Sequence, residues 1–416
     1  MAEAGSGSVG DPVTDQSASA RGNRQIVWVA TIAALGLAAS WCISLKLWVS
    51  TRSYPLTPVV PRLPAIPYPL DYALVGIVLV LLCAVPFVPR RRPVLIAIVT
   101  GVALLWMGDQ SRWQMWCYQY LVMLIALAAY SWRPDDEAGR EAALNSCRIV
   151  VAGVYFWSGL QKVNFSFMLY GFPSLMEPMT SVLSPGLARV VNWTGFVVPV
   201  AEAGIGVGLL LSRTRRFAAA AALGMHAFLL LLLGPLVSNY NPVVWPWNAA
   251  MMGFLVVLFL GFGSVEAQHV MSPRYGRLHV VVVILFWVMP ALSLVGLWDS
   301  YLSAALYSSN IKVSRIYISD GVRRALPAEV QAYVERAPDG RYVLRPSTWS
   351  TREMRAVAYP EYRVFRNIAR AVCRHAAAPS DVILEIDGPS RSWLWNPSLL
   401  LTTGRRMTVR DSCATL

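Results

Sequence analysis

Three ionisable side chains of this chain lie in apolar segments, where a charge is costly. Lys162 stands near the end of VYFWSGLQKVNFSF, Glu202 stands in VPVAEAGIGVGLL, and His226 stands in GMHAFLLLLL. A lysine that is removed from water can be neutral at working pH and can take a proton from a substrate. A nearby carboxylate or imidazole can hold or relay that proton. These residue types predict proton transfer by Lys162, with Glu202 and His226 as proton carriers.

Each of these residues also has a structural interpretation. A lysine near a helix end can extend its ammonium group into the lipid headgroups. A carboxylate in the middle of a span can be satisfied by a neighbouring helix, and Gly204 and Gly208 provide the small-xxx-small spacing of a close helix contact. A lone histidine inside a span often packs with its nitrogens satisfied. The sequence leaves both interpretations open.

The residues before Lys162 predict one face of a helix. Tyr155, Ser158 and Lys162 fall at positions i, i+3 and i+7, which places them on the same side. Gly159 beside them allows another helix to approach closely. Tyr155 and Ser158 are therefore candidate substrate-binding residues next to the lysine.

Two further stretches, GDQSRWQMW and SNYNPVVWPWN, combine polar and aromatic residues. Asparagine side chains can bind a polar headgroup or a ring carbonyl, whereas Trp and Tyr also suit simple anchoring at the membrane–water interface. An aspartate and an arginine three positions apart can also pair with each other at the end of a span. The two stretches supply six candidate substrate-binding residues: Asp109, Arg112, Trp116, Asn241, Trp245 and Asn248.

The composition indicates that membrane helices must position these side chains. Of 416 residues, 56% are hydrophobic and only 14% are charged, whereas about a quarter of a soluble domain is charged. The apolar residues form runs about as long as a bilayer is thick, and the alternating segments of a β-barrel are absent. We expect a multi-pass protein of the cell membrane, embedded in the lipid bilayer. The net charge is +13, and the sequence contains no nucleic-acid-binding motif. We therefore expect the positive charge to interact with anionic lipid headgroups and expect no nucleic-acid partner.

We expect an all-α polytopic bundle of about eight or nine transmembrane helices, followed by a small α+β soluble domain. Residues 1–24 are small and polar and are expected to form a disordered lead, residues 25–298 the helical bundle, and residues 299–416 the soluble tail. Hydropathy predicts nine spans, at about 25–48, 69–89, 93–108, 116–132, 149–164, 191–211, 217–236, 243–262 and 279–298.

Arginine-bearing loops alternate with charge-poor loops along the bundle. The four loops around residues 90–92, 132–148, 213–216 and 274–277 all carry arginine. The positive-inside rule places them in the cytoplasm together with the N-terminus, so that nine spans leave the tail extracytoplasmic. Lys46, Arg52 and Arg62 flank an assigned outer loop and oppose this orientation.

The tail has both strand-like and helix-like patterns. KVSRIYIS and DVILEIDG alternate between apolar and polar residues, and YPEYRVFRNIARAVCRH has the period of an amphipathic helix. Cys373 and Cys413 both lie in the tail and can form a disulfide if the tail is extracytoplasmic. The six cysteines show no CxxC or Cys/His spacing, so no metal site is expected.

Three stretches together resemble one family. VYFWSGLQKVNFSF is similar to a segment of the vitamin K-dependent gamma-carboxylases and of their bacterial relatives, the horizontally transferred transmembrane domain (HTTM) family. MGDQSRWQMWCYQYLVML and GMHAFLLLLLGPLVSNYNPVVWPWNAAMM are similar to two further segments of that family. The resemblance covers about residues 25–310 and implies an active site toward the non-cytoplasmic face of a multi-span bundle.

The resemblance implies roles for individual residues. Lys162 corresponds to the lysine that acts as a base toward reduced vitamin K, His226 to a later histidine and Asp109 to an aspartate. It implies a bacterial integral membrane protein that uses a reduced quinone, such as menaquinone or vitamin K hydroquinone, in a carboxylase-like lyase or quinol-oxygenating oxidoreductase reaction. Lys162 would deprotonate the hydroquinone, and His226 or Glu202 would hold or relay the proton.

A non-catalytic function stays open as the alternative. The bundle would then anchor a scaffold that presents the tail to a protein partner. The two hypotheses differ in geometry: binding chemistry predicts that Lys162, Glu202 and His226 converge on one cavity, whereas a scaffold predicts that they are dispersed. Transport ranks third, because neither related halves nor broken helices are evident.

Overall fold

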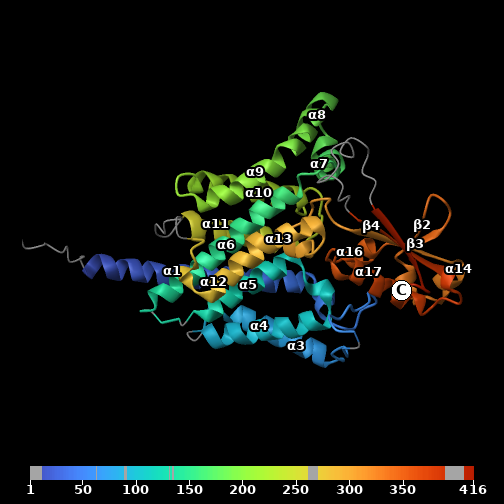
Figure 1. The fold of residues 1–416 in the computed structure, drawn as a ribbon, viewed down its shortest axis with the longest axis horizontal. Helices are drawn as coiled ribbons and strands as arrows, with labels where there is room; N and C mark the ends of the chain where they lie inside the picture. The colour runs from blue at the N-terminus through green and yellow to red at the C-terminus, as the bar shows by residue number, and fades with distance from the viewer. Residues whose placement is uncertain are drawn as a thin grey trace, which may run out of the picture.

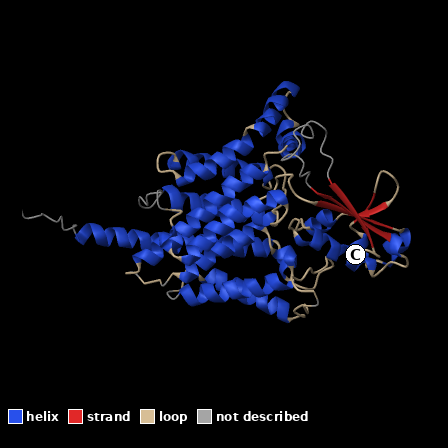
Figure 2. Ribbon diagram, viewed as in Figure 1, coloured by secondary structure: helices blue, strands red, loops and turns tan. Residues whose placement is uncertain are grey.

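The computed structural model describes residues 12–61, 63–88, 91–130, 132–133, 135–260, 270–388 and 407–416. These residues form a helical bundle with a small antiparallel sheet at one end (Figures 1 and 2). The first helix, α1, begins at Pro12, within the stretch that was expected to be a disordered lead, and residues 1–11 lie outside the described part. The predicted boundaries at residues 24 and 298 stay predictions.

Each of the nine predicted spans overlaps helix in the described part of the chain, because each is a long apolar run that must satisfy its own backbone hydrogen bonds in lipid. The helices of the bundle are α1 (Pro12–Ile43), α2 (Leu45–Trp48), α3 (Leu70–Ala84), α4 (Arg91–Gly108), α5 (Met115–Ala129), α6 (Glu137–Gln161), α7 (Phe172–Thr180), α8 (Pro185–Trp193), α9 (Val198–Leu210), α10 (Arg215–Leu233), α11 (Val244–Leu255), α12 (Arg277–Val283) and α13 (Met289–Leu292).

Four helical stretches in the described residues are long and apolar enough to cross a membrane: Gly22–Ile43, Arg91–Gly108, Arg215–Leu233 and Arg277–Val295. The pair Pro185–Phe196 and Val198–Leu210, bent by 45°, adds a fifth if it is one span. The chain is therefore a multi-pass integral membrane protein, but the predicted count of eight or nine transmembrane helices is not confirmed. The reason is length, since α3 and α5 have 15 residues each and about 20 are needed to span the hydrocarbon core.

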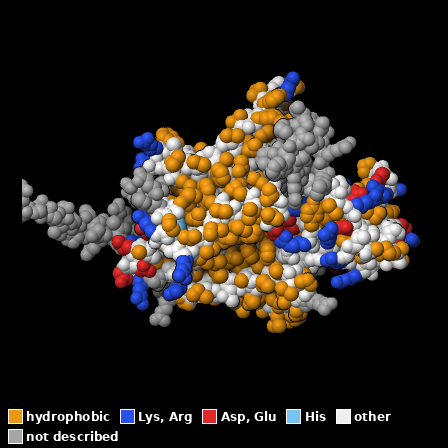
Figure 3. All heavy atoms as spheres, viewed as in Figure 1, with side chains coloured by type: hydrophobic (Ala, Val, Ile, Leu, Met, Phe, Trp, Pro, Cys, Tyr) orange, Lys and Arg blue, Asp and Glu red, His pale blue; other side chains and the backbone are white. Residues whose placement is uncertain are grey.

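The surface of the bundle agrees with a lipid environment. In the view of Figure 3, hydrophobic side chains cover the middle of the bundle, whereas charged side chains gather at its two ends. The connection between α9 and α10 and the start of α4 lie at the end that is remote from the sheet (Figure 1). Both carry arginine, namely Arg213, Arg215 and Arg91.

The tail contains a five-stranded antiparallel sheet of order β2-β3-β1-β4-β5. The two predicted strands are β1 and β4, and they are neighbours that pair Ile316 with Leu384. The predicted helix is α17, which buries Phe365, Ile368 and Val372. The strands are β1 (Val313–Ile318), β2 (Val334–Arg336), β3 (Tyr342–Leu344), β4 (Val382–Gly388) and β5 (Met407–Ser412), and the helices are α14 (Asp320–Ala325), α15 (Ala328–Gln331), α16 (Pro346–Met354) and α17 (Tyr362–Cys373).

A disulfide and a set of polar contacts hold the tail together and fasten it to the bundle. Cys373 and Cys413 form a disulfide that joins the end of α17 to the residue after β5. Glu353 of α16 accepts hydrogen bonds from the Ser53 and Tyr54 backbone N–H groups at 2.7 and 2.9 Å. The carboxylate thereby ties the sheet domain to the loop that follows α2.

Candidate functional site

A cavity of about 70 Å³ lies among α6, α9, α10, α11 and the segment 304–307 that leads to the tail. Several water molecules would fit in this volume. Leucine and methionine contribute seven of the 17 residues of the wall. The polar part of the wall includes six of the residues that the sequence nominated: Tyr155, Ser158, Lys162, Glu202, His226 and Asn248.

The first polar chain in the cavity runs from Ser158 through Lys162 to Glu202. Lys162 is the residue directly after α6, and its Nζ donates to Ser158 Oγ at 2.7 Å and to Glu202 Oε2 at 2.6 Å. The two charged side chains are only 12% and 9% exposed. A cation at the C-terminus of a helix is also favoured by the helix dipole. Lys162 is therefore held inside the protein by a carboxylate from another helix.

Two glycines explain why α9 brings Glu202 to this place. A Cβ atom on Gly159 would lie 2.3 Å from Ala203 N, and a Cβ atom on Gly206 would lie 2.5 Å from Phe156 N. The backbones of α6 and α9 thus touch where side chains are missing, as is typical of membrane helices. The predicted close approach at Gly159 is confirmed.

The close helix contact that was predicted for Gly204 and Gly208 is found at Gly208 and not at Gly204. A Cβ atom on Gly208 would lie 3.0 Å from Ala218 Cβ of α10. A Cβ atom on Gly204 would meet no described atom within 4 Å. The spacing of small residues marked the correct helix, but the face that packs depends on how the helix is rotated, which the spacing does not specify.

The second polar chain in the cavity runs from Tyr155 through His226 to Asn248. His226 Nδ1 lies 2.7 Å from Asn248 Oδ1, and Asn248 Nδ2 donates to the Val244 carbonyl at 2.8 Å. Since Asn248 Oδ1 can only accept, His226 Nδ1 carries the proton. In the neutral ring Nε2 is then the acceptor, and the Tyr155 hydroxyl, 2.5 Å away, donates to it. The tyrosine proton points at the histidine, and the backbone of α11 orients the chain.

Asp109 and Arg112, also nominated by the sequence, do not line this cavity. Asp109 forms buried ion pairs with Arg52 and, at 3.9 Å, with Arg112. Burial alone would raise the pKa of the Asp109 carboxyl, but the charges of the two guanidinium groups, with hydrogen bonds from Arg52 and from the Ser111 backbone N–H, hold that pKa below its ordinary value. The carboxylate also accepts from Thr57 Oγ1 at 2.8 Å. This cluster fastens the loop after α2 to the end of α4, as in the structural interpretation.

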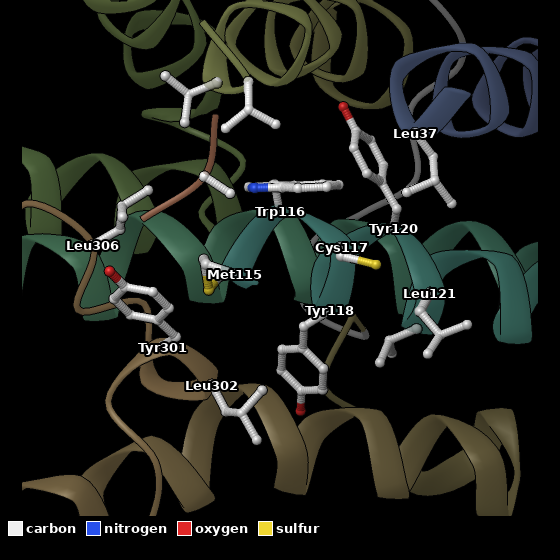
Figure 4. Packing of buried hydrophobic residues seen from close by; sticks show 14 of the residues in the cluster. Leu37, Met115, Trp116, Cys117, Tyr118, Tyr120, Leu121, Tyr301, Leu302 and Leu306 are labelled. Atoms are coloured by element: carbon white, nitrogen blue, oxygen red, sulfur yellow. The ribbon is translucent and has the colours of Figure 1, made fainter. Parts of the chain in front are cut away.

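The other three candidates also lie outside the cavity wall. Trp116 packs in the hydrophobic core beside Met115 (Figure 4). Its ring lies edge-on to Trp48, with 6.1 Å between the ring centroids. Trp245 donates to the Leu233 carbonyl at 3.0 Å. Asn241 donates to the hydroxyl of Tyr307, which does line the cavity. Asn241 thus supports the wall from behind.

Sequence reasoning missed the part of the wall that comes from the segment after the bundle. Ala304, Leu306 and Tyr307 line the cavity, and Leu306 lies near Met115 in Figure 4. Ala304 and Tyr307 have φ angles of 59° and 58°, which are unusual for residues with a side chain. This segment lies in GLWDSYLSAALYSSN, whose aromatic residues are typical of a membrane interface, but nothing in that sequence indicates a contact with α6.

Residues 140–244 are similar to a family described as Methylamine utilisation protein MauE. This range includes Tyr155, Ser158, Lys162, Glu202 and His226, but it ends before Asn248. No curated protein and no solved structure matches the chain. The similarity therefore covers α6 to the start of α11, which build most of the cavity.

The predicted resemblance to the HTTM family and the gamma-carboxylases is wrong. The family model that fits the segment around Lys162 is that of MauE. A small residue, a lysine and aromatic residues recur wherever an apolar helix ends near a membrane surface. Such a local pattern is too short to identify one family, and the residue roles that depended on carboxylase kinship are withdrawn with it.

Proposed function

We propose that this protein binds the polar head of an amphipathic small molecule, such as a reduced quinone, in the cavity and exchanges a proton with it. One observation carries the proposal: two hydrogen-bonded polar chains, centred on Lys162 and His226, line a single cavity that is otherwise apolar. Buried ionisable groups in membrane helices are costly and typically mark functional sites. An apolar pocket with a few convergent polar groups is the usual form of a ligand site.

The ion pair suggests how Lys162 becomes a base. Lys162 Nζ and Glu202 Oε2 form an ion pair at 2.6 Å. Transfer of one proton from Lys162 Nζ to Glu202 Oε2 yields a neutral amine and a neutral carboxyl group. The low dielectric of the cavity makes this neutral pair more accessible than it is in water. The free amine can then accept the proton of a ligand hydroxyl, while Ser158 Oγ holds the amine in place.

The second chain suits recognition of an oxygen atom. When the Tyr155 hydroxyl turns from His226 Nε2 toward a ligand oxygen, it becomes a donor to that oxygen. His226 Nε2 is then free to accept a hydrogen bond from a ligand O–H group. Asn248 keeps the imidazole in the required tautomer through the 2.7 Å contact at Nδ1.

Equilibrium binding of reduced menaquinone to the protein in lipid nanodiscs tests the proposal. Lys162→Met should lose most of the binding, whereas Lys46→Met is the matched control because Lys46 is an exposed lysine in α2, remote from the cavity lining. Methylammonium is added as a competitor, because the matched family is named for methylamine utilisation. Binding that is equal in both variants, or absent from the folded wild type, would overturn the proposal.

We also propose that the N-terminus is cytoplasmic and the tail extracytoplasmic. The disulfide between Cys373 and Cys413 supports this orientation, since disulfides persist in oxidising compartments. The arginine-bearing connections at the opposite end of the bundle support it as well. A protein partner for the tail stays a prediction, and so does the scaffold function that it would serve.

A further inference from the structure

The segment between α6 and α9 forms a hairpin that projects sideways from the bundle. It consists of a π-helical turn (Phe167–Gly171), α7 and α8, and it leaves the bundle at the end nearest the sheet (Figure 1). α8 has no buried residue at all. Val182 is 81% exposed and Trp193 65%. An apolar surface of this kind is stable in lipid and costly in water.

The hairpin is attached to the bundle by a hydrophobic cluster that is separate from the main core. The cluster consists of Phe167, Phe172 and Met176 from the hairpin and Leu232 from α10. Met168 and Met179 pack against it. Methionine is flexible and fills space in several conformations, so this attachment can rearrange without large loss of contact.

Where the chain continues into α9, Ala201 N donates to the Val197 carbonyl at 2.9 Å; apart from this bond, no hydrogen bond or ion pair joins the hairpin, taken as residues 167–197, to any other described helix. Its other polar contacts stay inside the hairpin or go to Asn164, whose Oδ1 accepts from Phe167 N at 2.8 Å. The opposite wall differs. Two hydrogen bonds hold the segment from 300 to 312. Lys312 Nζ donates to Glu361 Oε2 at 2.5 Å, and Asn310 Nδ2 donates to Gln161 Oε1 at 2.6 Å. Polar contacts therefore hold the side of the cavity toward the tail, whereas the side toward the hairpin is held by apolar packing.

One residue connects the hairpin to the cavity. Leu175 of α7 packs against the separate cluster and also lines the cavity, together with Met225 and Leu229 of α10. α7 is therefore the wall between the cavity and the lipid. Leu231, two positions after Leu229, is exposed on the outer surface of the same helix.

We propose that the ligand of this cavity is dissolved in the bilayer and enters laterally, between α7 and α10. The proposal rests on the proposed function, namely that the cavity binds a ligand. It adds that the ligand reaches the cavity from the lipid bilayer and not from water. It depends on three observations: the exposed apolar hairpin, its attachment through a methionine-rich cluster without polar contacts, and the position of Leu175. A ligand with an apolar tail can leave that tail between the helices while its head reaches Lys162.

Cysteine labelling in lipid vesicles tests the route without any ligand. The exposed Cys42 and Cys83 are first replaced by serine, while Cys117 and Cys147 are buried. Leu229→Cys then places a thiol in the cavity wall. An N-alkylmaleimide dissolved in the bilayer should label it faster than a sulfonated, membrane-impermeant maleimide. Leu231→Cys is the control for the first reagent, and Asp339→Cys, in the exposed turn between β2 and β3, is the control for the second.

A second substitution shows whether the hairpin controls entry. Met176 is buried in the separate cluster, so Met176→Ala should loosen α7 and speed labelling at position 229 several-fold. Val182→Ala, in the same hairpin but exposed, should leave the rate unchanged. Faster labelling by the charged reagent, or a rate that Met176→Ala does not change, would overturn lateral entry. Absence of menaquinone binding by the folded wild type would overturn the proposed function instead, because the labelling needs no ligand.

Discussion

Lys162 Nζ lies 2.6 Å from Glu202 Oε2, across the contact between α6 and α9. Both side chains are almost completely buried, so neither charge is well hydrated. Each one depends on the other for its stability. The pair is thus a structural link between two helices and also the charged part of the cavity wall.

Breaking this pair from one side should be more harmful than removing it completely. Lys162→Met leaves a buried carboxylate without its cation, and loss of one partner of a buried pair costs about 3–5 kcal/mol. The double variant Lys162→Met with Glu202→Leu should be more stable than either single variant. Denaturant unfolding in detergent measures the free energies. Additive losses in the double variant would contradict the coupling.

A methyl group added to α9 should be tolerated at Gly204 but should destabilise the protein at Gly206, where α6 and α9 approach closely. Gly206→Ala places a Cβ 2.5 Å from the Phe156 backbone, and such overpacking costs about 1–3 kcal/mol. Gly204→Ala is the matched control on the same helix, because it meets no atom within 4 Å. Thermal unfolding of both variants checks the prediction. Equal midpoints would show that the helices can separate without cost.

The histidine should lose its fixed tautomer when its partner is removed. Asn248→Leu leaves the His226 Nδ1–H group without an acceptor, and a buried unsatisfied group costs about 1–3 kcal/mol. Nitrogen chemical shifts of the imidazole report the tautomer, and unfolding reports the cost. Asn192→Leu in α8 is the control, since Asn192 Oδ1 has no hydrogen-bond partner among the described residues. An unchanged tautomer in Asn248→Leu would exclude the orienting role of Asn248.

The carboxylate of Asp109 should make the fold sensitive to acid. Its pKa is held below the ordinary value, mainly because Arg52 and Arg112 outweigh the effect of burial. Its contribution is therefore fully present above the ordinary pKa of about 3.9 and is lost as the pH falls toward the lower, folded-state pKa. Asp109→Asn should lower stability at pH 7 and weaken its decline in acid. Unfolding curves from pH 7 to pH 3 test this, and a parallel decline in both proteins would refute it.

The disulfide of the tail should stabilise the sheet domain. Cys373 and Cys413 are separated by 40 residues, and closing a loop of that length contributes about 4 kcal/mol in the chain-entropy model. The paired substitution Cys373→Ser with Cys413→Ser should make the tail more sensitive to protease than wild type. Alkylation of the denatured, non-reduced protein provides the check on the bond itself. Labelling of both cysteines in protein from intact membranes would contradict the disulfide and the extracytoplasmic tail.

Local patterns in the sequence predicted the elements well. Apolar runs located helix at all nine predicted spans, and period-two alternation located β1 and β4, because both patterns depend only on which side of an element is buried. They could not give the number of spans, since α3 and α5 are short and α6 carries charged residues in its first half. Whether such a helix crosses the bilayer depends on which of its side chains neighbouring helices shield from lipid.

The sequence by itself determined which residues are costly inside a membrane, and Lys162, Glu202 and His226 were recognised on that basis alone. Only the tertiary structure decided their partners: Glu202 with Lys162, His226 with Tyr155 and Asn248, and Asp109 with Arg52 at a different place. The physical reason is that the cost of burying a charge depends on residue type and local hydropathy. The compensation for that cost comes from whichever helix the packing brings near, and here the packing depends on the missing side chains of Gly159 and Gly206.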